Sequence, residues 1–91
     1  MRLYLAVDIS DDDVELQEVA EQCGYDLKHP AVLDLSAPAV AAYHGEACLM
    51  VQLSFAEPLS AAELEAVFVQ SEVLISHPSV AGVRKLALTS D

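Results

Sequence analysis

The sequence predicts an α+β fold built from two strand–helix–strand units of similar length. Alternating apolar residues at 2–9 and a strongly apolar run at 47–55 are typical of strands, and each run precedes a segment with a helical pattern. In each unit a related tetrapeptide then leads to a short apolar segment; the tetrapeptides are His-Pro-Ala-Val at 29–32 and His-Pro-Ser-Val at 77–80. Two such units favour a split β-α-β-β-α-β order, called ferredoxin-like, with two helices on one face of an antiparallel sheet.

The first unit is expected to consist of a strand at 2–9, a helix and a short strand at 32–35. Ser10 can cap this helix, and Asp13 occupies the capping-box position three residues later. Gly24 suits a left-handed stop at the far end. Helical spacing then predicts the buried stripe of this helix, which comprises Leu16, Val19, Ala20 and Cys23.

The second unit repeats this plan with a strand at 47–55, a helix after Ser60 and a strand at 83–88. Ser60 and Glu63 form the pattern of a capping box, which predicts where this helix begins. The β-branched residues at 67–75 would also fit a strand, but the cap and a complete inner stripe favour the helix. That inner stripe comprises Leu64, Val67, Phe68, Ser71, Leu74 and Ile75.

The segment 36–44 is compatible with two structures. Ser36 at a cap position and Gly45 at a stop position would suit a short helix, whereas the run 39–43 before His44 and Gly45 would suit one arm of a hairpin. Both keep the α+β class. The positions that share a face under the assigned periods predict a single core of Leu3, Leu5, Val7, Leu16, Val19, Leu49, Val51, Leu53, Leu64, Val67, Phe68, Leu86 and Leu88.

Length and composition predict one domain over residues 1–91. Hydrophobic residues make up 54% of the chain, so a net charge of −11 is carried by a globular body. Cys23 and Cys48 are too few for a disulfide framework, and no signal peptide precedes the first strand, which predicts a cytoplasmic protein with reduced thiols. No apolar run approaches the roughly 20 residues that cross a bilayer. Four cations are too few to neutralise phosphates, so direct binding of nucleic acid is disfavoured.

No residue pattern indicates catalysis, a cofactor or a metal site. His29, His44 and His77 lie far from one another and from cysteine, unlike the ligands of a local metal site. The serines lie in no nucleophile elbow, and isolated glycines form no phosphate-binding loop. His44 and Glu46 place a base and an acid at one turn, which is the weakest of the functional hypotheses. We therefore expect a protein that is not an enzyme and uses no cofactor.

One feature does indicate a binding surface, namely the acidic run after the first strand. Its carboxylates at i, i+3 and i+4 repel one another on the predicted helix, and no Lys or Arg lies among them to offset this. A solubilising face or adaptation to high salt would be the alternative explanation. The predicted partner-binding residues are Asp11, Asp12, Asp13, Glu15, Glu18 and Glu21.

These observations predict a small acidic, non-enzymatic binding module or inhibitor. On a helix about 15 Å long, six carboxylates approach the charge density of duplex DNA, about one per 1.7 Å. The expected partner is a basic protein surface, most naturally that of a nucleic-acid-binding protein, and the expectation includes no membrane. In size and charge the chain resembles the small acidic phage inhibitors that mimic DNA, anti-CRISPR proteins among them. The alternative is a ligand-sensing or dimeric regulatory domain of ferredoxin-like fold, and a homodimer is compatible with either function.

Overall fold

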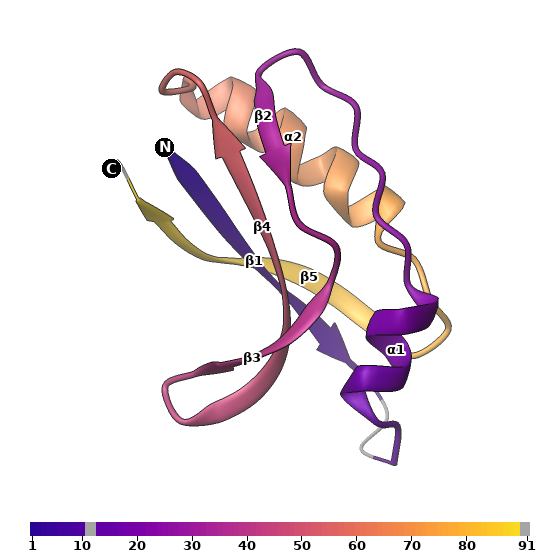
Figure 1. Ribbon diagram of the computed structural model, residues 1–91. Coiled ribbons are helices and arrows are strands. Elements are labelled where there is room, and N and C mark those ends of the chain that lie inside the picture. The colour runs from indigo at the N-terminus through magenta and orange to yellow at the C-terminus, as the bar shows by residue number, and fades with distance from the viewer. Residues whose placement is uncertain (11–12, 90–91) are drawn as a thin grey trace.

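The computed structural model describes residues 1–10 and 13–89 and belongs to the predicted α+β class (Figure 1). Its elements, in chain order, are β1 (Arg2–Ile9), α1 (Leu16–Gln22), β2 (Val32–Leu35), β3 (Ala39–Tyr43), β4 (Glu46–Phe55), α2 (Ala61–Leu74) and β5 (Val80–Thr89). The strands form one antiparallel sheet in the order β2-β4-β1-β5, and β3 pairs with β4 as well. The described residues thus contain five strands, where the predicted order has four.

The additional strand arises because the chain that pairs with β4 is divided in two. β2 pairs with the end of β4 near Phe55, and β3 pairs with its beginning, from Glu46 to Met50. Between them the Gln52 N–H donates to the Ser36 hydroxyl at 2.8 Å, and Pro38 has no N–H to donate. A side chain therefore replaces a backbone partner at this point, which interrupts the ladder.

The segment 36–44 contains a hairpin arm, the second of the two structures compatible with the sequence. β3 and β4 are joined by the two-residue turn His44-Gly45, with Tyr43 opposite Glu46. Both turn residues have positive φ, 52° at His44 and 82° at Gly45. This is the backbone of a type I′ turn, whose twist matches that of the flanking strands, and glycine adopts it without steric cost.

One hydrophobic core lies between the sheet and the helices. Leu3, Leu5 and Val7 of β1 are buried opposite buried leucine and valine residues of β4. Val19 of α1 and Val67 of α2 belong to the same buried cluster, so both helices contribute to it. The predicted core residues that the structure buries are Leu3, Leu5, Val7, Val19, Leu49, Val51, Leu53 and Val67.

The prediction was less accurate at the edge of the sheet. Leu88 is 49% exposed, so its assignment to the core is wrong. A register shift opposite Tyr4 and Leu5 bends β5 and places Lys85, not an apolar residue, opposite Leu5. The other predicted core residues are half-buried, and these are Leu16, Leu64, Phe68 and Leu86.

The second helix begins as predicted and the first does not. In α2 the Ser60 hydroxyl accepts from the Glu63 N–H, and the Glu63 carboxylate accepts from the Ser60 N–H. α1 begins only at Leu16, and Glu15 at its N-cap position makes no side-chain capping bond. The predicted capping box of Ser10 and Asp13 is therefore wrong.

Tertiary contacts explain this difference at the first helix. The N–H and hydroxyl of Ser10 donate to the Ser79 carbonyl at 2.8 and 3.1 Å, which holds Ser10 beside Ser79, six residues before α1 begins. The predicted left-handed stop at Gly24 is also wrong, because α1 ends at Cys23 in extended geometry, and Gly45 is the glycine with positive φ among the described residues. Neither helix in the described part of the chain has the length and apolar character needed to span a membrane.

Candidate functional site

The predicted binding residues lie in the connection between β1 and the end of α1, which we call the acidic segment (residues 11–21). Asp11 and Asp12 lie outside the described residues. Asp13 lies in a turn before α1, Glu15 at its N-cap, and Glu18 and Glu21 within it. The prediction that all six carboxylates share one helix is therefore wrong, because α1 has 7 residues and contains two of them.

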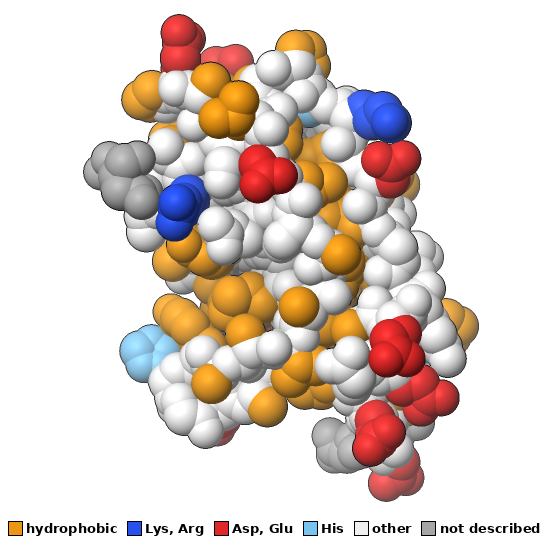
Figure 2. Space-filling model, in the orientation of Figure 1, with side chains coloured by type: hydrophobic (Ala, Val, Ile, Leu, Met, Phe, Trp, Pro, Cys, Tyr) orange, Lys and Arg blue, Asp and Glu red, His pale blue; other side chains and the backbone are white. Residues whose placement is uncertain are grey.

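The four described carboxylates of the segment are all exposed to solvent. Figure 2 shows acidic side chains gathered at the end of the molecule where α1 lies, whereas the Lys and Arg side chains visible on this face lie on its other half. Glu21 accepts a hydrogen bond from Gln17 at 3.4 Å. Within residues 1–10 and 13–89, the side chains of Glu15 and Glu18 have no ion pair or hydrogen bond.

Cations elsewhere in the chain are engaged with other carboxylates. Lys28 lies 3.8 Å from Asp26, and Lys85 lies 2.8 Å from Glu65. The Arg84 Nε donates to both Asp8 oxygens at 2.9 and 3.0 Å, and this hydrogen bond raises the pKa of the guanidinium. Three of the four cations of the chain therefore lie beside carboxylates outside the acidic segment.

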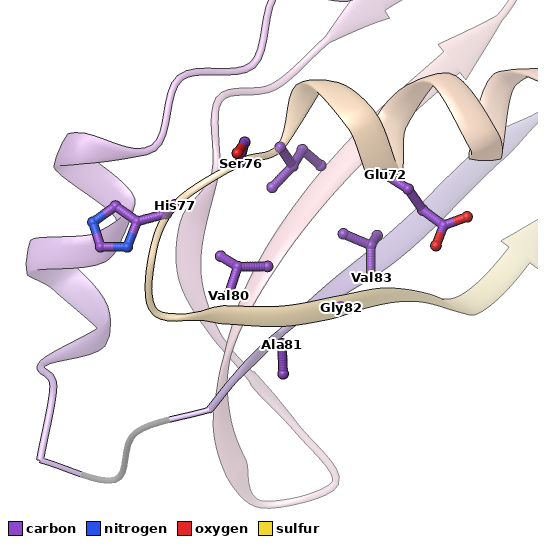
Figure 3. A pocket seen from close by; sticks show the side chains of 8 residues that line it. Glu72, Ser76, His77, Val80, Ala81, Gly82 and Val83 are labelled. Carbon is purple, nitrogen blue, oxygen red and sulfur yellow. The ribbon is translucent and has the colours of Figure 1, made fainter.

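Both ends of the acidic segment are anchored on the same turn, residues 77–79, between α2 and β5. At its start, the N–H and the hydroxyl of Ser10 donate to the Ser79 carbonyl at 2.8 and 3.1 Å. At its end, Nε2 of His77 lies 2.8 Å from Oε1 of Gln22 in α1. Figure 3 shows the His77 ring projecting from this turn toward α1. The acidic segment is therefore held at two points rather than hanging freely.

The two His-Pro tetrapeptides form the same turn. The N–H of Ser79 donates to Nδ1 of His77 at 3.1 Å, and the N–H of Ala31 donates to Nδ1 of His29 at 3.1 Å. In each case the following valine N–H donates to the histidine carbonyl, and that valine begins a strand. Because Nδ1 accepts, the ring hydrogen is on Nε2, and at His77 this N–H donates to Gln22. Both histidines thus have a structural role.

His44 and Glu46, the acid–base pair of the weakest functional hypothesis, lie at the tip of the β3–β4 hairpin. His44 is exposed at the hairpin tip with its ring edge on Tyr43, centroids 4.3 Å apart, and Glu46 lines a cavity of about 230 Å³ beside the Asp8–Arg84 pair. Another cavity, of about 270 Å³, lies under the turn 77–79 and is lined mostly by small and apolar side chains (Figure 3). The described residues contain no cluster of three or more metal-ligating side chains.

The two cysteines are free thiols in different environments. Cys23 is buried in the core, and burial raises the pKa of its thiol. Cys48 is partly exposed on β4. The predicted description of Cys23 as a small core residue is confirmed.

Comparison with known proteins does not add to this geometry, because no protein-family model, curated protein or solved structure matches the chain.

Sequence reasoning did not identify the anchors of the acidic segment. The His-Pro repeat signalled the turn at 77–79, but not that Gln22, 55 positions away, would contact His77. The sequence patterns also predicted no role for the outward side of α2, where Val69 and Val73 are exposed. These two valines fall outside the predicted inner stripe of the helix. Apolar residues at such positions are the sequence signal that could have indicated an exposed apolar surface.

Proposed function

We propose that the chain is a non-enzymatic binding module whose acidic segment masks a basic surface of another protein. The observation that carries the proposal is that Glu15 and Glu18 are exposed and unpaired among the described residues, on a segment anchored at both ends. The most natural partner is a nucleic-acid-binding protein, because its phosphate sites would accept carboxylates in the same places.

The energetics of the segment support this proposal. Glu18 and Glu21 form a like-charge pair at i+3 within α1, and such a pair costs about 0.2–0.5 kcal/mol in a helix. A cationic partner would turn this repulsion into attraction and would be steered toward the acidic end of the molecule. Anchoring by Ser10 and His77 also lowers the entropy that the segment loses on binding.

We also propose that the topology is the ferredoxin-like β-α-β-β-α-β order. On this interpretation β2 and β3 are two halves of one edge strand. Both pair antiparallel with β4, and only residues 36–38 separate them. The interruption at Ser36 and Pro38 would then be a local feature of an otherwise four-stranded sheet.

A charge-reversal experiment tests the function. Glu15→Lys with Glu18→Lys reverses the field in the middle of the segment and leaves the buried residues of α1 unchanged. Glu63 and Glu65 are unsuitable as controls, because they form the α2 capping box and the ion pair with Lys85. Glu46→Lys with Glu57→Lys is better, because both residues are exposed, their side chains have no hydrogen bond or ion pair within the described residues, and the net charge changes equally.

The three proteins are immobilised and used for affinity purification from the native host. We expect one basic protein to bind the wild type and the control doublet but not the first doublet, and to be released by duplex DNA. Retention of the same protein by the Glu15/Glu18 doublet would exclude the acidic segment as the binding surface. Equal loss with both doublets would show that bulk charge, and not this segment, controls the interaction.

A further inference from the structure

The outward side of α2 is unusually apolar for a surface helix. Val73 is 72% exposed and Val69 is 48% exposed, and Ala62 and Ala66 are exposed on the same side. Their spacing of four, three and four residues aligns them along one face, which we call the α2 ridge (Ala62, Ala66, Val69 and Val73). The opposite face of α2 is buried in the core. A surface helix normally carries polar side chains on the side opposite its buried face.

The α2 ridge borders a groove that could receive another element. Leu27 and Lys28, from the connection between α1 and β2, face Val69, Val73 and Leu74 across a space of about 420 Å³. Leu74 is itself 41% exposed. The groove is lined by these apolar residues together with Asp26, Lys28 and Gln70, and α2, with 14 residues, offers a length of about 21 Å.

Carboxylates lie along both sides of the ridge. By helical spacing Glu65 and Glu72 flank it on one side, and Asp26 lines the groove on the other. Lys85 pairs with Glu65 and Lys28 with Asp26, whereas the Glu72 side chain has no ion pair or hydrogen bond within the described residues. The uncompensated carboxylate beside the ridge is therefore Glu72, which is complementary to a basic side chain next to an apolar strip.

We propose that the α2 ridge and its groove bind a basic amphipathic helix of a partner protein. Such a helix would place apolar side chains at i, i+3, i+4 and i+7 on Val69 and Val73, and a Lys or Arg side chain beside Glu72. A second copy of this chain fits less well, because its own carboxylates would meet these and each chain has a net charge of −11. The ridge is a separate surface from the acidic segment and extends the proposed function.

The test uses a synthetic amphipathic peptide of leucine and lysine, about 18 residues or five helical turns long. A scrambled peptide of the same composition lacks the apolar face and measures the purely electrostatic attraction. Binding is followed by fluorescence anisotropy in about 0.15 M salt, where long-range attraction is screened. We expect the amphipathic peptide to bind wild-type protein at least about tenfold more tightly than the scrambled one.

Variants locate the binding surface. Val69→Ser with Val73→Ser should weaken binding of the amphipathic peptide at least about tenfold, and Glu72→Lys should weaken it several-fold. Leu33→Ser is the matched control, because Leu33 is 71% exposed but lies on β2. The Glu15/Glu18 doublet should retain binding within about threefold, which separates this surface from the acidic segment. Thermal melts establish that every variant is folded.

Three results would overturn the proposal. Equal affinity for the scrambled peptide would show that charge alone attracts the peptide. Equal loss in Leu33→Ser and in the valine doublet would show that the ridge is not the site. Sedimentation of the wild type as a dimer that Val69→Ser with Val73→Ser converts to monomer would identify a second copy as the occupant.

Discussion

Two hydroxyl groups connect the loop after α1 to the interior side of α2. The Tyr25 and Ser71 hydroxyl oxygens lie 2.5 Å apart, and Ser71 Oγ lies 2.8 Å from the Val67 carbonyl, to which it donates. Because Ser71 has one hydroxyl hydrogen, Tyr25 must be the donor in the first bond. Ser71 is the buried polar residue of the described core, and both of its hydrogen-bonding needs are met here.

This arrangement predicts a pH dependence of stability. Burial raises the pKa of the Tyr25 hydroxyl, so the folded pKa lies above the unfolded value of about 10. The stabilisation is fully present below about pH 10 and is lost as pH rises through the folded pKa. Tyr25→Phe should cost about 1 kcal/mol at neutral pH and flatten this alkaline loss. Urea titrations between neutral and alkaline pH measure both effects, and an unchanged alkaline slope in the variant would contradict the assignment.

The two thiols should react at different rates in the folded protein. Cys23 is 2% exposed and burial raises the pKa of its thiol, so little reactive thiolate is present and access is blocked. We expect the aromatic disulfide reagent DTNB to label one thiol rapidly in native buffer and the second only on unfolding. Cys48→Ser should remove the rapid phase, and Cys23→Ser should leave it. A rapid phase that persists in Cys48→Ser would show that α1 opens readily.

At the scale of elements, the two helices are stabilised in different ways. α2 has a capping box within four consecutive residues, so a local pattern determines where it begins. α1 has 7 residues, no side-chain cap and one buried residue, Val19. A helix so short is marginal in isolation, and α1 therefore depends on its contacts with the turn at 77–79 and with the core.

The His-Pro repeat provides a matched pair of variants that test whether α1 depends on its contact with the turn at 77–79. His77→Ala and His29→Ala each remove the same bond from the i+2 backbone N–H, at a cost of about 1 kcal/mol. Only His77 also contacts Gln22. We expect His77→Ala to accelerate hydrogen exchange at the amides of α1, and His29→Ala to leave those amides unchanged. Equal acceleration in both variants would show that the tether to Gln22 does not stabilise α1.

At the scale of the whole molecule, uneven charge is the dominant feature. The net charge is −11, yet the buried residues of the described core are apolar except for Ser71, whose hydroxyl is hydrogen-bonded. Repulsion between carboxylates therefore acts at the surface. Such repulsion between exposed groups is screened over about 8–10 Å at physiological salt. Most of the folding free energy therefore comes from burial that salt affects little.

A thermal melt across a salt series separates a binding role from adaptation to high salt. For a binding module we expect a folded protein in ordinary buffer and a modest rise of the melting temperature as salt screens the acidic segment. A domain that unfolds at low ionic strength and recovers only in molar salt would identify the acidity as a halophilic device. That outcome would count against the proposed masking function.

Much of the fold could be predicted because its signals are local. Alternation identified β1, a strongly apolar run identified β4, and the capping box placed α2 within a residue of its observed start. The candidate site was predicted less well, since its carboxylates were identified but placed on one helix. The pattern at 10–23 predicts a helix that begins just after Ser10, whereas Ser10 is bonded to the Ser79 carbonyl and α1 begins six residues later.

The sequence by itself therefore determined the α+β class, the core faces of the central strands and the position of α2, because neighbouring residues decide these features. Only the tertiary structure decided where α1 begins, where the edge strand is interrupted and how the acidic segment is anchored. Those features depend on hydrogen bonds between Ser10 and Ser79, 69 positions apart, and between Gln22 and His77, 55 apart. The sequence shows which donor and acceptor groups each residue carries. Which distant group each of them bonds is determined only when the chain folds and brings those segments together.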